Sequence, residues 1–419
     1  MVYQTNLRSR SVNFNPVQPS IMHIDLNSCF ASCEQQANPL LRNKPVAVVH
    51  SDAPYGCILA PSVEAKLWGI KTGMSLQEGK QICPFLIPRV ADPPKYREVH
   101  HQLGELLSQY SDHVVSKSID EFVLTLPSCR GDLYGRPCDP TIIASQIKSN
   151  IHTQVGDYLR VSIGISTNQN LAKLASGLHK PNGLDIIDSH NFLSIYASIS
   201  LQDFCGINTR NEARLHRVGI FTPLDFYHAS LPTLTRAFQS VLGRYWYTRL
   251  RGYEIDEVSF TRQSFGQSYV LPHPMTYGEW RPILAKLVSK AGRRLRASGY
   301  HATATHLYLR FVNHTSLPAQ AGWHTGHQLH TPLFRDCDLL SSALALRPPP
   351  TQQVKKIAVT FFGLSRDPGQ LALLRDNSRD VALAHALDTL NNKWGEYSVI
   401  SAAMMGTEHH VKDAIAFGK

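Results

Sequence analysis

The sequence predicts a mixed α/β protein of several domains, from the order of its expected elements, a change of character after Gly252, and the length of the chain. Strand-like apolar runs alternate with helical patterns through most of the first half, which is typical of a sheet with helices packed on it. Beyond Gly252 the expected helices and strands carry a strong basic excess. A chain of 419 residues also exceeds the usual size of one domain, so about two to four domains are expected.

The first half is expected to alternate strands with helices. The run 21–26 is almost continuously apolar, which favours a buried strand, and the spacing of Val99, Leu103 and Leu106 predicts a helix over 96–110. In chain order we expect strands at 21–26 and 45–49, helices at 27–34, 62–69, 76–83 and 96–110, a strand around Asp120, a helix at 142–152 and a strand at 159–165. Helices that cross between strands indicate a mixed α/β core.

The second half is expected to be helical at first and then α+β. The run 203–220 resembles one helix-hairpin-helix, and 280–295 is amphipathic, with its apolar stripe set apart from most of its lysines and arginines. His324, His327 and His330 recur every third residue in a run rich in glycine and threonine, for which we prefer a surface loop to a metal site. The remaining predictions are strands at 305–312 and 354–362 and helices at 336–346 and 381–390.

The composition is ordinary for a soluble globular protein. Hydrophobic residues make up 43% of the chain, and no apolar run approaches the roughly 18–20 residues of a membrane helix. Residues 1–19 lack the apolar core of a signal peptide and are expected to be a disordered leader. The eight cysteines show neither a CxxC motif nor zinc spacing, which fits a reducing compartment and predicts a cytoplasmic protein with no membrane partner.

Most of the positive charge lies in one segment. The formal net charge is +10, and between residues 261 and 365 twelve lysines and arginines stand against three acids, which gives +9. A local excess of this size favours a surface that contacts a phosphate backbone. Within the segment, Arg293, Arg294 and Arg310 are candidate DNA-binding residues.

Two short motifs place carboxylates at the edges of apolar runs. I-D-L-N-S-C-F-A-S-C-E, at 24–34, contains Asp25, and S-I-D-E-F, at 118–122, contains Asp120 and Glu121. Adjacent acids among apolar residues face a large desolvation penalty unless cations neutralise them. Two divalent metals held by three carboxylates drive in-line phosphoryl transfer, and hard oxygen ligands favour Mg²⁺.

As a pair, these motifs resemble those of the Y-family translesion DNA polymerases, the DinB/UmuC group, and the resemblance runs from about Ser20 to the end of the chain. It implies a right-hand polymerase with a palm, fingers, a helix-hairpin-helix thumb and a C-terminal little finger. The implied boundaries are a leader at 1–19, palm at 20–28 and 92–187, fingers at 29–91, thumb at 188–252, linker at 253–262, little finger at 263–365 and tail at 366–419.

The resemblance also assigns roles to individual residues. Asp25 and Asp120 are expected to bridge two Mg²⁺ ions, with Glu121 on the catalytic ion and the Leu26 carbonyl on the second. Phe30 is expected to be the steric gate that rejects a ribose 2′-hydroxyl, and an ordinary core phenylalanine is the alternative. The remaining roles are triphosphate binding by Cys29, Phe30, Lys66 and Lys180, and DNA binding by Gly206, Ile207 and Asn208.

The chain departs from the DinB pattern in the expected fingers. Val63 and Lys66 stand where that pattern has a tyrosine and an arginine, and a lysine keeps the charge but loses the bidentate fork. The choice between DinB-like and UmuC-like therefore stays open. Small residues at Cys57 and Ala60 favour a roomy site over the nascent base pair, which predicts low fidelity and tolerance of damaged templates.

The implied activity is template-directed primer extension by a monomer that binds primer–template DNA and a dNTP. One rival is a catalytically weak accessory paralogue that binds DNA and a clamp, and primer extension would decide between the two. A second rival is a palm-type nucleotide cyclase, for which the basic segment has no purpose. A polymerase turns over only when a primer–template is present, whereas a cyclase does not need one, so this dependence distinguishes the two.

A short motif after the expected little finger predicts a further partner. Residues 370–374, Q-L-A-L-L, resemble the bacterial pentapeptide Q-L-x-L-F that binds the sliding clamp. The start of a tail helix is the alternative interpretation. The candidate clamp-binding residues are Gln370, Leu371, Leu373 and Leu374.

Overall fold

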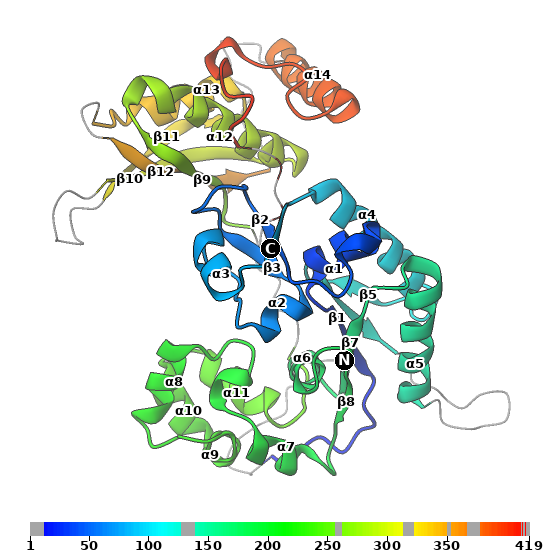
Figure 1. Ribbon diagram of the computed structural model, residues 1–419. Coiled ribbons are helices and arrows are strands. Elements are labelled where there is room, and N and C mark those ends of the chain that lie inside the picture. The colour runs from blue at the N-terminus through cyan, green and yellow to red at the C-terminus, as the bar shows by residue number, and fades with distance from the viewer. Residues whose placement is uncertain are drawn as a thin grey trace. The chain divides into compact units, whose positions relative to one another are not determined.

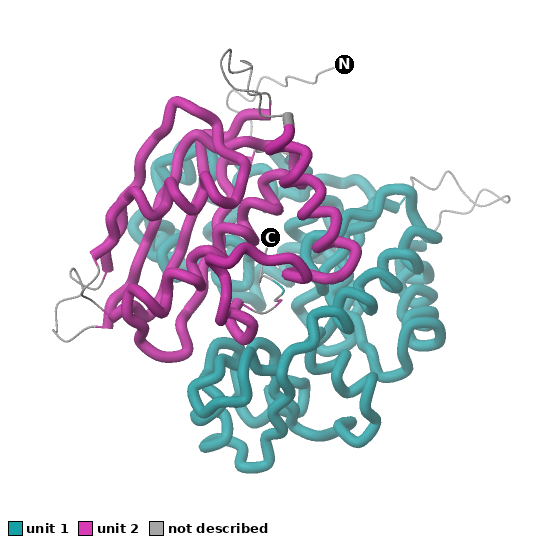
Figure 2. The backbone as a smooth tube through the Cα atoms, turned by 90° about the horizontal axis from the view of Figure 1, so that it is seen from above, with its two compact units in different colours: residues 1–257, 414–419 teal, residues 258–413 magenta. Residues whose placement is uncertain are grey.

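The computed structural model describes residues 12–126, 139–255, 262–312, 322–349, 353–366, 378–411, 413 and 415. The chain divides into two compact units, which are coloured separately in Figure 2. Unit 1 comprises Met1–Glu257 with Ala414–Lys419, and unit 2 comprises Val258–Asp413. No helix in the described ranges is long and apolar enough to cross a membrane.

A five-stranded sheet forms the centre of unit 1 (Figure 1). Its order is β5-β6-β1-β7-β8, with bounds Val114–Ser116, Glu121–Thr125, Ile21–Leu26, Val161–Ser166 and Leu184–Ile187. The central strand β1 pairs antiparallel with both β6 and β7. This register places Asp25 directly opposite Glu121.

Helices cover the two faces of this sheet. Met22, Ile24 and Leu26 of β1 face a core shared with α1 (Cys29–Ala37), α4 (Pro93–Leu107) and α5 (Pro140–Asn150). Ile21 packs on the other face with Ala172 of α6 (Gln169–Leu178). A Cβ at Gly164 of β7 would collide with the Ala172 carbonyl, so glycine there lets α6 approach closely.

A small α/β part and a helical part complete unit 1. The first has a sheet β3-β2-β4 (Ile58–Pro61, Val46–Val49, Ile87–Val90) with α2 (Val63–Leu67) and α3 (Leu76–Ile82). The second contains α7 (Phe192–Ser198), α8 (Thr209–His216), α9 (Pro223–His228), α10 (Leu231–Phe238) and α11 (Leu242–Arg249) around an aromatic core.

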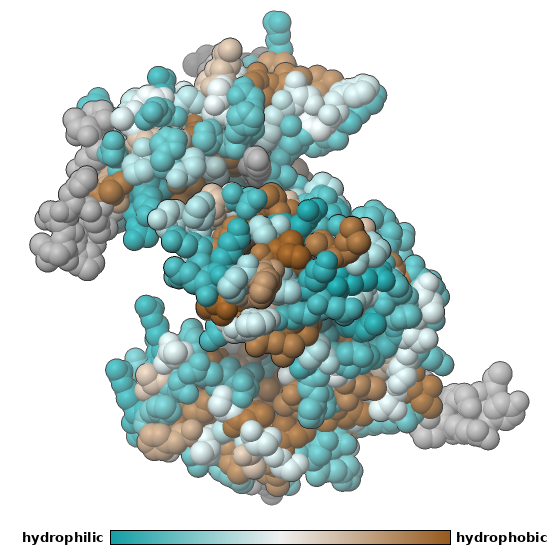
Figure 3. Space-filling model, viewed as in Figure 1, coloured by the Kyte–Doolittle hydropathy of each residue, from teal (hydrophilic) through white to brown (hydrophobic). Residues whose placement is uncertain are grey.

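The exposed surface contains apolar side chains in the small α/β part of unit 1. Figure 3 shows hydrophobic residues gathered in patches on an otherwise largely hydrophilic face. Large exposed side chains in this part include Tyr55, Leu67 and Trp68. Single apolar side chains at a surface are normal, and we assign no role to these three.

Unit 2 is a four-stranded antiparallel sheet with helices on one face. The order is β11-β10-β12-β9, with bounds Gly322–Leu333, His301–Phe311, Val354–Ser365 and Ser264–Met275. Helices α12 (Tyr277–Ala297) and α13 (Asp336–Ala345) bury the apolar stripe predicted from the sequence. The C-terminal part contributes α14 (Ser378–Trp394) and a short 3₁₀ helix, Ala402–Met404.

The loop predicted around His324, His327 and His330 is wrong, because all three lie on strand β11. Exposure alternates along this strand, so His327 faces the helices and contacts Ser342 Oγ at 2.8 Å, whereas His324 and His330 are exposed on the open face. Residues three apart point to opposite faces of a strand, and the three imidazoles therefore cannot converge on one metal.

Candidate active site

The three predicted carboxylates meet at one end of the five-stranded sheet in unit 1. Asp25 is the fifth residue of β1 and faces Glu121, the first residue of β6. Asp120 directly precedes β6, and its carbonyl accepts a hydrogen bond from the Leu26 N–H at 2.9 Å. Pairing between strands thus brings together two motifs that are about ninety-five residues apart in the sequence.

Two lysines neutralise two of these carboxylates. Lys180 Nζ lies 2.6 Å from Asp25 Oδ2, and Lys173 Nζ lies 2.8 Å from each oxygen of Glu121. His23 Nε2 is 3.8 Å from Glu121 Oε2, which is an ion-pair distance only when the imidazole is protonated. Sequence reasoning found Lys180 but missed Lys173 and His23, although both occur in the runs that carry the family resemblance.

The pKa values of Glu121 and Asp25 are shifted in opposite directions by their surroundings. The pKa of Glu121 is lowered to about 2 by His23 and Lys173, which outweigh the opposing effect of burial. The pKa of Asp25 is raised, chiefly by burial and also by the charges of Asp120 and Glu121, against the lowering effect of Lys180. Glu121 is therefore held as a carboxylate at neutral pH, whereas burial and the neighbouring carboxylates oppose the charge of Asp25.

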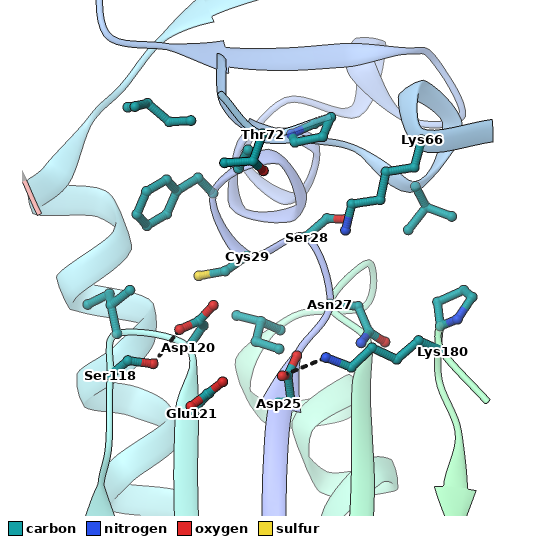
Figure 4. A pocket seen from close by; sticks show the side chains of 18 of the residues that line it. Asp25, Asn27, Ser28, Cys29, Lys66, Thr72, Ser118, Asp120, Glu121 and Lys180 are labelled. Carbon is teal, nitrogen blue, oxygen red and sulfur yellow. Dashed lines mark hydrogen bonds and ion pairs between the residues drawn. The ribbon is translucent and has the colours of Figure 1, made fainter. Parts of the chain in front are cut away.

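A cavity of about 650 Å³ opens over these groups. Figure 4 shows Asp25, Asp120 and Glu121 on one side of it and Lys66 reaching in from α2 on the other. The pKa of the Lys66 ammonium is lowered by burial and by Lys180, as expected for two cations that share one cavity. A cavity lined by both lysines and carboxylates suits a polyanion that carries divalent cations, because the lysines can bind the anion and the carboxylates can bind the cations.

The predicted gate lies in the wall of this cavity. Phe30, in the first turn of α1, is 5% exposed and stacks on Tyr96 of α4 with ring centroids 4.4 Å apart and an interplanar angle of 11°. The Tyr96 hydroxyl donates a hydrogen bond to buried Glu34 at 2.9 Å, and Lys95 Nζ lies 3.0 Å from the same carboxylate. These contacts fix the Phe30 ring from behind.

Cys29, a predicted nucleotide contact, and Val63, which departs from the family pattern, bring no charged side chain to the cavity. Cys29 is buried beside Phe30, and its thiol pKa is raised well above the ordinary value by a hydrogen bond with Cys33 and by burial. Val63 lines the cavity and donates no hydrogen bond through its side chain. The cavity therefore offers Lys66 and Lys180 as its cations on the nucleotide side.

The donor set fits a hard divalent cation. Carboxylate and carbonyl oxygens are the ligands that Mg²⁺ prefers, and the cavity contains Asp25, Asp120, Glu121 and Leu26. Within the described ranges, no three His, Cys, Asp or Glu side chains converge closely enough to hold a metal by themselves. Two of the carboxylates are instead turned to their lysines, as the ion pairs above show.

The three predicted DNA contacts in the helical part, Gly206, Ile207 and Asn208, form the turn that precedes and caps helix α8. Gly206 adopts φ +106°, and Asn208 caps α8 by accepting a hydrogen bond from the Asn211 N–H at 3.0 Å. Ile207 is 4% exposed and belongs to the aromatic core, and its N–H donates to the Phe204 carbonyl at 2.9 Å. The Ile207 side chain and amide are thus both engaged within this part of unit 1.

The basic residues of unit 2 divide into two groups, and Arg293 belongs to the group that contacts other parts of the same unit. Its guanidinium donates to Asn392 at 2.8 Å and lies 3.4 Å from Glu396, so it contacts the C-terminal part of unit 2. Arg296 makes two hydrogen bonds to Asp388, at 2.6 and 2.9 Å, and Lys290, Lys286 and Arg335 contact the same C-terminal part. Of the acids that pair with α12, Asp336 lies within residues 261–365, over which the charge was counted, whereas Asp388 and Glu396 lie beyond them.

The second group of basic residues stays on the open face of the sheet. Arg310 of β10 is exposed and pairs in register with Lys356 of β12, and both lie on the face opposite α12 and α13. Arg294, the third predicted contact, is exposed and donates to the Gln267 side chain at 3.0 Å. The predicted clamp motif, Gln370, Leu371, Leu373 and Leu374, lies outside the described residues.

Comparison with known proteins covers most of the chain. The impB/mucB/samB family matches residues 24–177, and the C-terminal domain of the same family matches residues 262–373. A protein from Moorella thermoacetica that carries the name DNA polymerase IV is 30% identical over 393 residues, which are 90% of this chain and 94% of that protein. DNA polymerase IV from Pelotomaculum thermopropionicum is 29% identical over 92% of this chain and 95% of its own length.

A solved structure shows the same fold. A Y-family DNA polymerase chimera of Dbh and Dpo4 aligns with a TM-score of 0.66 and 21% sequence identity, over 83% of this chain and 99% of that one. This likeness confirms the predicted class of fold, with palm, fingers, thumb and little finger.

Proposed function

The chain belongs to the impB/mucB/samB family of Y-family DNA polymerases, and from this membership we infer that it is a DNA-directed DNA polymerase that performs translesion synthesis. The observation that carries this inference is the set of three carboxylates at one end of the central sheet. It occurs in a chain whose alignment covers 94% of the DNA polymerase IV from Moorella thermoacetica. Its substrates are primer–template DNA and a dNTP. Neither the accessory paralogue nor the nucleotide cyclase is favoured.

We propose that Asp25, Asp120, Glu121 and the Leu26 carbonyl hold two Mg²⁺ ions. When bound, these ions supply the charge neutralisation that lets a primer 3′-hydroxyl attack the α-phosphate while pyrophosphate leaves. Asp25 and Glu121 are released to serve as ligands when Lys180 and Lys173 turn from them towards phosphate oxygens. Support comes from the donor set and from the convergence of the three carboxylates at one end of the sheet.

The nucleotide is held between the palm and the fingers, within unit 1. Lys180 and Lys66 bind the triphosphate as point charges, and the backbone of Cys29 and Phe30 at the start of α1 supplies N–H donors. Phe30 packs under the deoxyribose and excludes a 2′-hydroxyl. Ala60, which also lines the cavity, leaves room over the base pair for damaged templates, whereas Cys57 lies outside the lining.

DNA is held electrostatically and without sequence preference. The open face of the unit 2 sheet, with Arg310 and Lys356, and the cap of α8 around Gly206 and Asn208 contact phosphates. The boundaries given above for palm, fingers, thumb, linker, little finger and tail are our assignment of these parts. We further propose a monomeric, cytoplasmic enzyme whose segment Gln370–Leu374 binds a sliding clamp.

Primer extension on undamaged and damaged templates tests this function, with Asp120→Asn and Glu121→Gln as matched variants that keep side-chain shape. We expect extension by the unaltered chain, a loss of about a thousandfold or more in either variant, and unchanged affinity for primer–template. Extension at a substantial fraction of the normal rate in either variant would remove that carboxylate from the metal site. No extension by the unaltered chain would leave the accessory paralogue.

A further inference from the structure

A buried amide joins the metal-binding strand to the loop that carries Lys180. Asn27, 5% exposed, directly follows β1, and its Oδ1 accepts a hydrogen bond from the Asn182 N–H at 2.7 Å. Its Nδ2 donates to the fully buried Ser162 hydroxyl at 3.0 Å, and that hydroxyl accepts from the Gly183 N–H at 3.2 Å. One side chain thus holds two consecutive amides of the loop, directly and through Ser162.

Asn27 contacts the loop at a residue whose backbone conformation needs support, and the Ile163 N–H also holds the loop by donating to the Gly183 carbonyl at 3.0 Å. Asn182 adopts φ +64°, a left-handed conformation that costs a non-glycine residue free energy unless its neighbours stabilise it. Lys148 of α5 supplies a further contact by donating to the carbonyls of Asn182 and Gly183. These contacts hold the backbone just after Lys180, whose side chain is 40% exposed and free to change partner.

We propose that Asn27 is a positioning residue for nucleotide binding, which fixes the loop 180–183 and so aims the Lys180 ammonium at the triphosphate. Figure 4 shows Asn27 between Asp25 and the loop, with Lys180 reaching back over it. The proposal rests on the triphosphate role of Lys180 and extends it to a group that touches neither nucleotide nor metal.

The test is a double-mutant cycle on the full chain with primer–template at saturating Mg²⁺. Asn27→Ala is expected to raise the KM for dNTP about tenfold, with kcat within about threefold of normal, as loss of a positioned charge requires. The dNTP Kd, measured on a primer that ends in a dideoxynucleotide, is expected to rise by the same factor. In a Lys180→Ala background, Asn27→Ala is expected to add less than about twofold, because coupled residues are not additive.

Two further variants separate positioning from mere support of the fold. Asn27→Asp keeps the acceptor for the Asn182 N–H, and the Ser162 hydroxyl can turn to donate to it, so KM is expected to stay within about threefold of normal. Ser162→Ala removes the contact from Asn27 through Ser162 to the Gly183 N–H. It is expected to raise the KM for dNTP, but by less than Asn27→Ala does. Thermal unfolding and primer–template affinity of each variant serve as controls.

The outcomes distinguish this inference from the proposed function. If Lys180→Ala leaves the KM and Kd for dNTP unchanged, the triphosphate role of Lys180 fails. If Lys180→Ala raises both but Asn27→Ala raises neither, or raises both equally in the two backgrounds, the positioning role of Asn27 is overturned. Should Asn27→Ala not fold, an additive effect of Ser162→Ala with Lys180→Ala would overturn it equally.

Discussion

Glu121 and its cations set the acid stability of unit 1 at the level of single residues. The pKa of Glu121 is lowered to about 2 from an ordinary value of 4.5, so its charged form is stabilised by folding. A lowered carboxyl pKa contributes stability above the unfolded value, and that contribution is lost as the pH falls from about 4.5 to about 2. The contribution is at most about 3.5 kcal/mol, at about 1.4 kcal/mol per pKa unit between 4.5 and about 2.

We therefore expect Glu121→Gln to lower the melting temperature of unit 1 at pH 7, with a smaller difference at pH 3. Differential scanning calorimetry of both proteins at the two pH values measures this. A difference that is equal at both pH values, or that grows on acidification, would contradict the lowered pKa.

Sugar selection also depends on single side chains. Phe30→Ala opens the space of the ring, so we expect the ratio of kcat/KM for dNTP over rNTP to fall by about two orders of magnitude or more, that is, at least about 2.7 kcal/mol. The matched control is Cys57→Ala, which changes an exposed side chain outside the lining of the cavity. An unchanged ratio in Phe30→Ala would make Phe30 an ordinary core residue.

Residue-level prediction from the sequence was strongest where two motifs occur together. Asp25, Asp120 and Glu121 were expected at one site because the paired motifs resemble those of the Y-family polymerases, and strand pairing brings the three residues to one end of the sheet. The contact of Lys173 with Glu121 could not be predicted from the sequence, since it depends on how closely α6 approaches the sheet, which Gly164 permits.

Among the elements, α12 shows how a basic helix can serve the fold instead of a ligand. Arg296, with its side chain 5% exposed, forms hydrogen bonds with Asp388 of α14 and Asp336 of α13. Buried charges of this kind are costly to leave unpaired, at about 3–5 kcal/mol when one partner is removed. The helix α14 is thus attached to α12 mainly through ion pairs.

Removing one partner should therefore release α14 without unfolding the sheet. We expect Asp388→Asn to speed hydrogen exchange in α14 by at least about tenfold, while β10 and β12 exchange as before. Arg379→Ala, a change at an exposed position on the same helix, is the control and should have little effect. Equal protection of α14 in Asp388→Asn and the unaltered chain would mean that the ion pairs do not hold it.

Helices and strands were predicted well where their periodicity was strong. The stripe of α12 and the buried run of β1 were confirmed because burial fixes such patterns. The strand β11 was missed because its inward side is marked by Trp323, Thr325 and His327, and its outward side by Gly326, so no apolar alternation is visible. Pairing with β10 decides its structure.

Over the whole molecule, charge position matters more than net charge. Only cations that remain uncompensated can release counterions from DNA, and each such contact contributes about 0.9 to the slope of log affinity against log salt. Arg310→Gln with Lys356→Gln should therefore reduce the slope by up to about 1.8. The matched pair Lys290→Gln with Arg293→Gln, whose charges already face Glu396, should leave it nearly unchanged.

Fluorescence anisotropy of labelled primer–template at several salt concentrations measures both slopes. Equal slopes for Arg310→Gln/Lys356→Gln and the unaltered chain would mean that the open face of the unit 2 sheet does not contact DNA. A reduced slope for Lys290→Gln/Arg293→Gln would mean that the C-terminal part leaves α12 when DNA binds.

The attachment of the C-terminal part to α12 has a practical consequence for anyone who shortens this protein. The family match ends at residue 373, and a chain cut there retains α12 but loses the acids Asp388 and Glu396. Such a truncated protein would carry unpaired cations on a helix whose charges the full chain partly neutralises. It would bind polyanions more strongly and less specifically than the full chain. A gain in apparent DNA affinity after truncation would therefore be an artefact of removing these acids.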